Sequence, residues 1–166
     1  MAISFIRVDD RIIHGQIVTR WLSELPADGV VAVDDDAANN SIISKVLKGA
    51  VPGGLKAFVM MVDHTAERWE DIVGSQKKYF LLAKTPITLA RLYKAGADFI
   101  TAQPNLNVGP MSERDGAIKV GPNANVLPEE MEAFQFLADH GMDINFQLVP
   151  DSKKTTFTEA VRQYNE

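Results

Sequence analysis

The sequence lacks several features that mark whole classes of protein. It has no cysteine, which excludes disulfides, zinc–thiolate centres and thiol catalysis. Its longest plainly apolar run, Ala57–Val62, is far too short to cross a bilayer. The 17 basic residues are outnumbered by 22 acidic ones, so the chain has no basic excess of the kind that a general nucleic-acid binder needs.

The N-terminus also lacks the apolar stretch of a signal peptide. Arg7, Asp9, Asp10 and Arg11 occupy the place where that stretch would lie. Together with the short apolar runs, this predicts a cytoplasmic protein that does not insert into a membrane by itself and reaches one only through a partner.

The composition is that of an ordinary globular domain. Of the 166 residues, 46% are hydrophobic and 23% are charged. There is no internal repeat, no low-complexity segment and no linker long enough to divide the chain. We therefore expect a single domain that spans residues 1–166.

Short apolar runs rich in Val, Ile and Phe alternate with amphipathic segments. Such runs are typical of strands that are buried on both faces. The predicted strands are Ile3–Val8, Val30–Val33, Ala57–Val62, Tyr79–Ala83, a stretch within Asp98–Val108, Ala117–Val120 and Ile144–Val149. The segment Gln103–Pro122 is less regular, and we expect a loop there with one short strand.

Helix signals lie between these runs. Ile17, Val18, Trp21, Leu22 and Leu25 fall on one helical face, and so do Ile42, Ile43, Val46 and Leu47 before Gly49. Further helices are predicted from a Thr65 cap to Gly74, from Thr85–Pro86 to Gly96, from Pro128 to Gly141, and over Phe157–Tyr164. The alternation predicts an α/β fold: an open, mostly parallel twisted sheet of about seven strands with helices on both faces.

The first strand leads into a turn that carries the most chemistry. Ligands of such sheets bind at the carboxyl ends of the strands, where we expect His14 to begin a helix. Free backbone N–H groups at a helix start favour an anion and disfavour imidazolium, so a neutral, nucleophilic imidazole is expected. Arg7 and Arg11 can hold a phosphoryl group, and either Asp9 or Asp10 can orient the ring.

Gly15 removes a side chain where a phosphate or a partner must come close. These are the components of a phosphohistidine intermediate.

Other strand ends supply candidates for the rim of the site. These are Asp34, Lys84 and Gly109, of which Lys84 is placed to face an incoming phosphate. For Asp34–Asp36 a solvated, helix-capping turn is the favoured interpretation over a partner contact. The three histidines, His14, His64 and His140, are far apart in sequence, and no Gly-x-Gly-x-x-Gly follows the first strand. We therefore expect no metal and no cofactor.

The turn itself resembles a known motif. Arg7-Val-Asp-Asp-Arg-Ile-Ile-His14-Gly-Gln16 is similar to the Arg-Ile-Asp-Asp-Arg-Leu-Ile-His-Gly-Gln of IIB components in the mannose/fructose/sorbose family of the bacterial sugar phosphotransferase system (PTS). The resemblance continues through residues 33–39, 83–86, 107–111 and 146–150. It spans essentially the whole chain.

The resemblance implies a function. A IIB protein of this family takes a phosphoryl group from a histidine of its IIA partner, holds it on Nδ1 of its own histidine, and passes it to a sugar in the membrane IIC/IID complex. The matching residue here is His14, with Arg7, Asp10, Arg11, Gly15 and Gln16 at neighbouring motif positions. It would make the protein a phosphotransferase that meets the membrane at IIC/IID.

Two departures from the family pattern concern the rim. The family has Asn-Val-Gly-Gly-Met where this chain has Pro110 in place of the second glycine, and Thr101–Leu106 is a few residues longer than usual. Proline has no backbone N–H, so residue 110 offers no amide to an anion.

A different function class also fits some of the residues. Asp9 and Asp10 after the first strand, Asp63 after the third, and Lys84 with Thr85 after the fourth have the order of a receiver-type signalling domain. Such a domain would bind magnesium and be phosphorylated on Asp63. His14 has no role in that alternative.

Overall fold

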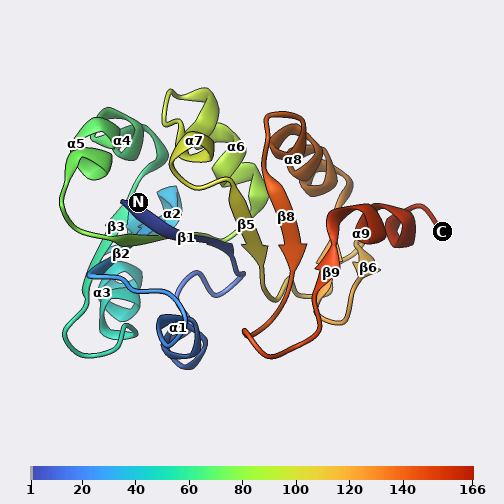
Figure 1. Cartoon of the computed structure of the whole chain (residues 1–166), viewed down its shortest axis with the longest axis horizontal. Coiled ribbons are helices and arrows are strands. Elements are labelled where there is room, and N and C mark those ends of the chain that lie inside the picture. Colours follow the sequence, from blue (N-terminus) through green and yellow to red (C-terminus); the bar gives the residue numbers. More distant parts are fainter. Residues whose placement is uncertain (1) are drawn as a thin grey trace.

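The computed structural model describes residues 2–166 and is built on one seven-stranded sheet (Figure 1). Neighbouring strands are parallel except for the last pair, β8 and β9. In spatial order they are β3 (Lys56–Met60), β2 (Gly29–Val33), β4 (Tyr79–Ala83), β1 (Ile3–Val8), β5 (Asn105–Val108), β8 (Asp143–Phe146) and β9 (Thr155–Thr156). The predicted α/β class with a mostly parallel sheet is confirmed.

Two hydrophobic cores lie against the two faces of this sheet. One face carries α1 (Gly15–Leu22) and α3 (Ser41–Gly49), where Phe5, Trp21 and Phe80 pack together. The other face is covered mainly by α4 (Val62–Glu67), α5 (Trp69–Gly74), α6 (Pro86–Lys94), α7 (Phe99–Ala102), α8 (Pro128–Asp139) and α9 (Phe157–Tyr164). Since the central strands are covered on both faces, they are mostly apolar, and Arg7 of β1 and Asn107 of β5 are buried polar exceptions.

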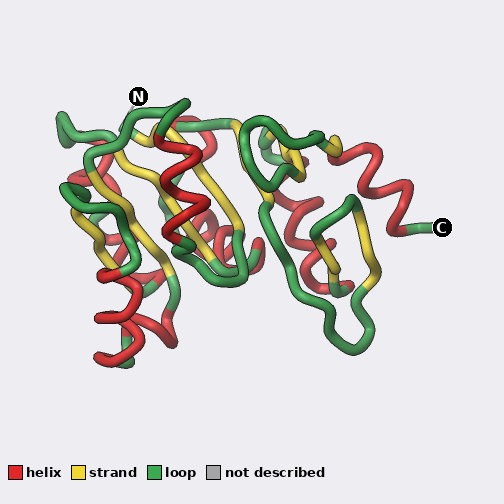
Figure 2. Tube along the Cα trace, turned by 90° about the horizontal axis from the view of Figure 1, so that it is seen from below, coloured by secondary structure: helices red, strands yellow, loops and turns green. Residues whose placement is uncertain are grey.

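The predicted strand Ala117–Val120 does not join the main sheet. It forms β6 (Ile118–Val120), which pairs with β7 (Ala124–Val126) in a separate antiparallel hairpin beside that sheet (Figure 2). The chain reverses at Gly121, where φ is +59°. Because Val120 and Val126 bury themselves in the core that also contains Ala160 of α9, the short strand needs no place in the main sheet.

The expected Thr65 cap is wrong. Helix α4 begins at Val62, and the Thr65 hydroxyl donates to the Met61 carbonyl within it. The cap comes instead from a short helix, α2 (Asp35–Ala38): the Asp35 carboxylate accepts from the Val62 amide at 2.8 Å. An acceptor 27 residues away leaves no local sequence signal.

Helix α3 forms where the sequence predicts it, with its apolar residues on one face. Of its four large apolar residues, however, only Leu47 is buried. Ile42 is 75% exposed, Val46 67% and Ile43 44%. None of the helices in residues 2–166 is both long enough and apolar enough to span a membrane.

Asp35 joins three helices and generates a prediction about acid stability. Its carboxylate also accepts from Arg91 of α6 at 3.0 Å, and the bonds from Val62 and Arg91 lower the pKa of Asp35. A lowered folded-state pKa stabilises the fold above the unfolded pKa, near 3.9, and that contribution disappears as the pH falls through the folded value. Asp35→Asn should lower the free energy of unfolding by about 1 kcal/mol at neutral pH.

Urea denaturation at pH 7 and near pH 3 measures this effect. The difference in the free energy of unfolding between Asp35→Asn and the parent should become smaller near pH 3. The matched control is Asp36→Asn at the exposed neighbouring position. A gap of equal size at both pH values, or an equal loss in the control, would contradict the role given to Asp35.

Candidate functional site

His14 lies at the carboxyl edge of the sheet, on the turn that follows β1, the strand between β4 and β5. It is the N-cap of α1, with extended backbone, and its carbonyl accepts from the Val18 amide at 2.9 Å. The ring is partly buried. Its Nε2 lies 3.2 Å from Nη1 of Arg11, while Nδ1 is shielded from solvent and has no hydrogen-bond partner in residues 2–166.

The two acidic residues of the turn do not orient the His14 ring. Asp9 is 1% exposed, and its Oδ2 accepts from Nε and Nη2 of Arg7 at 3.3 and 3.2 Å. Its Oδ1 accepts from the Arg11 backbone amide at 2.9 Å. Asp9 therefore shapes the turn through the backbone of Arg11, and the expectation that Asp9 or Asp10 holds the imidazole is wrong.

Arg7 is a structural residue here. It is 2% exposed, and besides Asp9 its guanidinium donates to the Asn107 side chain and to the Gln147 carbonyl at 3.3 Å. Burial lowers the pKa of Arg7, and the charge of Asp9 partly offsets that effect. The guanidinium is enclosed by these partners, so the predicted direct contact with a phosphoryl group has no support in the geometry.

The two glycines of the predicted site have packing roles that differ from those expected. A Cβ at Gly109 would lie 2.1 Å from Nη2 of Arg7, so only glycine leaves room for the buried guanidinium. A Cβ at Gly15 would lie 2.6 Å from the Ala50 carbonyl oxygen, at the C-terminal end of α3. Gly15 thus permits close approach of the protein's own backbone, where an approach by a phosphate or a partner is the expectation from the sequence.

Asp10 braces the turn against the loop after β5. Its carboxylate Oδ2 accepts from the Ser112 amide at 2.8 Å and from the Ser112 hydroxyl. Its own amide donates to the Pro110 carbonyl at 3.1 Å. Pro110 therefore takes part in the rim as an acceptor, the one backbone role that proline keeps.

The turn also contains a residue in an unfavourable backbone conformation. Ile12 has a φ of +60°, which is uncommon for any residue other than glycine and costly for a β-branched one. Its amide donates to the Asp9 carbonyl at 2.8 Å, and the Ile13 amide donates to the Arg11 carbonyl at 2.7 Å. Both isoleucine side chains are buried, so packing holds the turn that presents Arg11 and His14.

The remaining predicted residues are placed around this turn. Gln16 is exposed in the first turn of α1. Asp34 caps α2 by accepting from the Ala37 amide at 2.9 Å, which agrees with the favoured capping interpretation. Exposed Lys84 lines a cavity of about 290 Å³, which it shares with Asp10 and other residues of the carboxyl edge: Thr85, Met111, Ser112, Arg114 and Glu130.

An ion pair supports the far wall of that cavity. Arg114 donates to both carboxylate oxygens of Glu130, at 3.0 and 2.9 Å, and this bonding raises the pKa of Arg114. Glu130 also accepts from the Leu127 amide and so caps the start of α8. The loop after β5 is thereby anchored to a helix.

Sequence reasoning missed the roles of Ser112, Asn107 and Gln147. Asn107 and Gln147 fall within segments that resemble the family, but nothing in their local pattern shows that they surround Arg7. Asn107 donates to the Gln147 carbonyl at 3.0 Å, across two neighbouring strands. Such a contact depends on the sheet order.

The receiver alternative is contradicted by this arrangement. Asp9 is enclosed by Arg7, and Asp10 is bonded to Ser112. Within residues 2–166 no group of three or more His, Asp or Glu side chains is placed to hold a metal. The acids that would bind magnesium in a receiver are therefore not assembled around Asp63.

Comparison with known proteins identifies the family. The family model described as "PTS system sorbose subfamily IIB component" matches residues 3–166. The chain belongs to this family. IIB components are parts of phosphotransferase systems, so the turn that presents His14 belongs to a IIB domain.

Individual relatives agree. A probable phosphotransferase enzyme IIB component of Streptococcus pyogenes is 33% identical over 162 residues, covering 96% of this chain and 99% of that protein. The mannose-specific EIIAB component of Escherichia coli is 26% identical over the whole chain, which matches 50% of that longer protein. Among solved structures, manxB from Thermoanaerobacter tengcongensis is 29% identical with a TM-score of 0.86, over 99% of this chain and 97% of that one.

The enclosure of Arg7 generates a prediction about Gly109. Gly109→Ala should displace the guanidinium and lower the free energy of unfolding by about 1–3 kcal/mol, since over-packing a buried site has that cost. Thermal unfolding measures the loss. Gly53→Ala is the control, because nothing lies within 4 Å of a Cβ at Gly53. Equal melting temperatures for the two variants would contradict the packing role.

Proposed function

We propose that this IIB protein carries a phosphoryl group on His14. A IIA phosphohistidine donates the group, and a sugar bound to the membrane IIC/IID complex receives it. The observation that carries the proposal is the pairing of His14 with Arg11 at the carboxyl edge of the sheet, 3.2 Å apart, on a turn held by buried contacts. The IIA domain in the name of the E. coli relative supports a donor of that kind.

The reaction consists of two transfers of one group. In the first, a lone pair of the His14 ring attacks phosphorus as the P–N bond of the donor histidine breaks. In the second, a sugar hydroxyl oxygen attacks the same phosphorus and the P–N bond at His14 breaks. The electron pair of that bond returns to the ring nitrogen, which accepts the proton of the hydroxyl. Charge stabilisation and positioning do most of the work in such transfers, so no cofactor is required.

The family resemblance assigns the bond to Nδ1, the nitrogen that is shielded in this structure. A half-turn of the ring about the Cβ–Cγ bond exchanges the positions of Nδ1 and Cδ2. We propose that the ring turns in this way when the donor docks, and that the Arg11 guanidinium then bonds the phosphoryl oxygens in place of Nε2.

The other motif residues act through the turn. Arg7 and Asp9 hold the backbone of Arg11, Gly109 makes room for Arg7, and Asp10 ties the turn to Ser112. Lys84, Asp34 and Gln16 lie at the rim, where an approaching partner meets the protein. The sugar is bound by IIC/IID, so the IIB protein is cytoplasmic and reaches the membrane only by docking there.

The histidine substitution tests the proposal directly. His14→Ala should abolish labelling by the phosphorylated IIA donor, because no other residue takes its place. Asp63→Asn should be labelled like the parent. The label should survive alkali and be lost in acid, as expected of a phosphoramidate bond. An alkali-labile label, or labelling that depends on Asp63, would overturn the proposal.

A second substitution tests the role of the Arg11 guanidinium. Arg11→Ala should slow phosphoryl transfer by about a hundredfold, the usual cost of removing one donor from a developing charge. Arg20→Ala on α1 is the control, since Arg20 is an exposed arginine close in sequence whose ion-pair partner is Asp151. Melting temperatures should stay near that of the parent for both variants. Transfer by Arg11→Ala at the parental rate would remove Arg11 from the mechanism.

A further inference from the structure

Exposed apolar side chains are concentrated in one part of the molecule. Among the described residues six large hydrophobic side chains are exposed, and five of them lie between positions 42 and 61: Ile42, Ile43, Val46, Phe58 and Met61. The first three project from α3, Phe58 lies on β3, and Met61 directly follows that strand. Ile42, Ile43 and Val46 lie on the α1 side of the sheet, whereas Phe58, in register with Val31, lies on the α4–α5 side. We call these five side chains around the edge strand, with the lysines described next, the α3–β3 surface.

The charge of this region is opposite to that of the whole chain. Residues 37–62 contain no Asp or Glu, although the net charge of the protein is −5. They contain three lysines, Lys45, Lys48 and Lys56, and all three are exposed. The α3–β3 surface therefore combines exposed apolar side chains with exposed lysines around the edge strand of an acidic protein.

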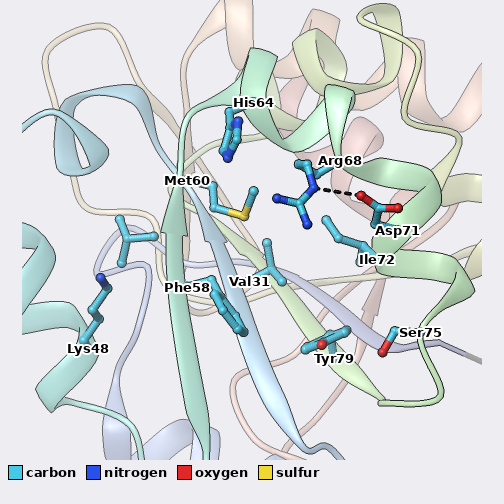
Figure 3. A pocket seen from close by; sticks show the side chains of 11 residues that line it. Val31, Lys48, Phe58, Met60, His64, Arg68, Asp71, Ile72, Ser75 and Tyr79 are labelled. Carbon is cyan, nitrogen blue, oxygen red and sulfur yellow. Dashed lines mark hydrogen bonds and ion pairs between the residues drawn. The ribbon is translucent and has the colours of Figure 1, made fainter.

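The surface includes a hollow along the edge strand of the sheet. A cavity of about 390 Å³ is lined by Lys48 from α3, by Phe58 and Met60 from β3, and by Arg68 (Figure 3). Arg68 is already paired with Asp71, an acidic residue of the rim, at 2.8 Å. Since β3 is the outermost strand on this side, the hollow opens beside an unpaired strand edge.

The same surface adjoins the turn that presents His14. The C-terminal end of α3 packs so closely on the start of α1 that a Cβ at Gly15 would lie 2.6 Å from the Ala50 carbonyl oxygen. Gly15 directly follows His14. A partner that covers about 800 Å², the usual area on one side of a stable protein–protein interface, can therefore contact both α3 and the histidine turn.

We propose that the α3–β3 surface docks the IIA phosphoryl donor, through a donor surface with an apolar centre and an acidic border. This inference rests on the proposed function, because it names where the donor of His14 binds. Opposite charge steers the encounter and raises the association rate, while burial of Ile42 and Val46 slows dissociation. A second copy of this chain fits less well, because lysines would face lysines across a symmetric contact.

The experiment compares apolar positions inside and outside the surface. Ile42→Asp and Val46→Asp should each lower kcat/KM for transfer from phosphorylated IIA by about tenfold or more, the loss expected for an apolar anchor. The effect should appear mainly in KM. The matched control is Ile118→Asp, because Ile118 is the remaining exposed large hydrophobic residue and lies on β6. Its kcat/KM should equal that of the parent.

Two charge-reversal variants test the role of the lysines of the α3–β3 surface. Lys45→Glu should reduce the association rate with IIA at low salt, and the reduction should shrink at high salt as the charges are screened. Lys119→Glu, at an exposed position of β6, should leave the rate near that of the parent. Equal association rates for the two variants would overturn the electrostatic part of the proposal.

Further measurements separate the possible failures. Small-molecule phosphorylation of His14 by phosphoramidate should be the same in all variants, because that reagent needs no docking surface. If IIA does not phosphorylate the parent protein, the proposed function fails. If the parent is phosphorylated and Ile42→Asp, Val46→Asp and Ile118→Asp do not differ, the docking inference fails and the proposed function stands. A loss confined to sugar transfer, or to binding of anionic phosphatidylglycerol vesicles, would also overturn docking of the donor.

Discussion

The buried ion pair between Arg7 and Asp9 is the contact on which the site depends. Removal of one partner would leave a charge in the interior, which is strongly destabilising. The pair does more than balance charge. Asp9 fixes the backbone of Arg11, and Arg7 reaches Asn107 on β5 and the Gln147 carbonyl after β8, so the turn is tied to three parallel strands. Position 109 requires glycine, because a side chain there would occupy the space of the Arg7 guanidinium.

In this arrangement the turn is held by many contacts, whereas the His14 ring makes few polar ones. The strained Ile12, the buried Ile13 and the brace from Asp10 to Ser112 define where Arg11 and His14 emerge. By contrast, the His14 ring makes one polar contact, through Nε2, and its Nδ1 has no partner in residues 2–166. A carrier must accept and release the same group, so a weakly held ring on a firmly held turn suits the proposed relay. The exposed, basic α3–β3 surface beside it supplies a place for a partner to bind.

Much of the fold followed from local patterns. The buried strands β1, β2 and β4 are largely apolar runs, and the helix starts at Thr85 and Pro128 are marked by local signals. These elements therefore lie close to where the sequence predicts them. The errors concern contacts between distant residues. The cap of α4 comes from Asp35, and β6 pairs with β7 instead of joining the main sheet. The apolar face of α3 is periodic as expected, yet periodicity cannot say whether a core or a partner covers that face.

The sequence by itself determined the α/β class, the family and the histidine turn, because apolar periodicity and the motif from Arg7 to Gln16 are written in adjacent residues. Only the tertiary structure decided what those residues touch. In the folded chain Arg7 and Asp9 are buried, the Asp10 carboxylate accepts hydrogen bonds from Ser112, and Arg11 lies beside His14. The reason is physical: a side chain acquires its partners from the order and register of the strands, which bring together residues up to 140 positions apart.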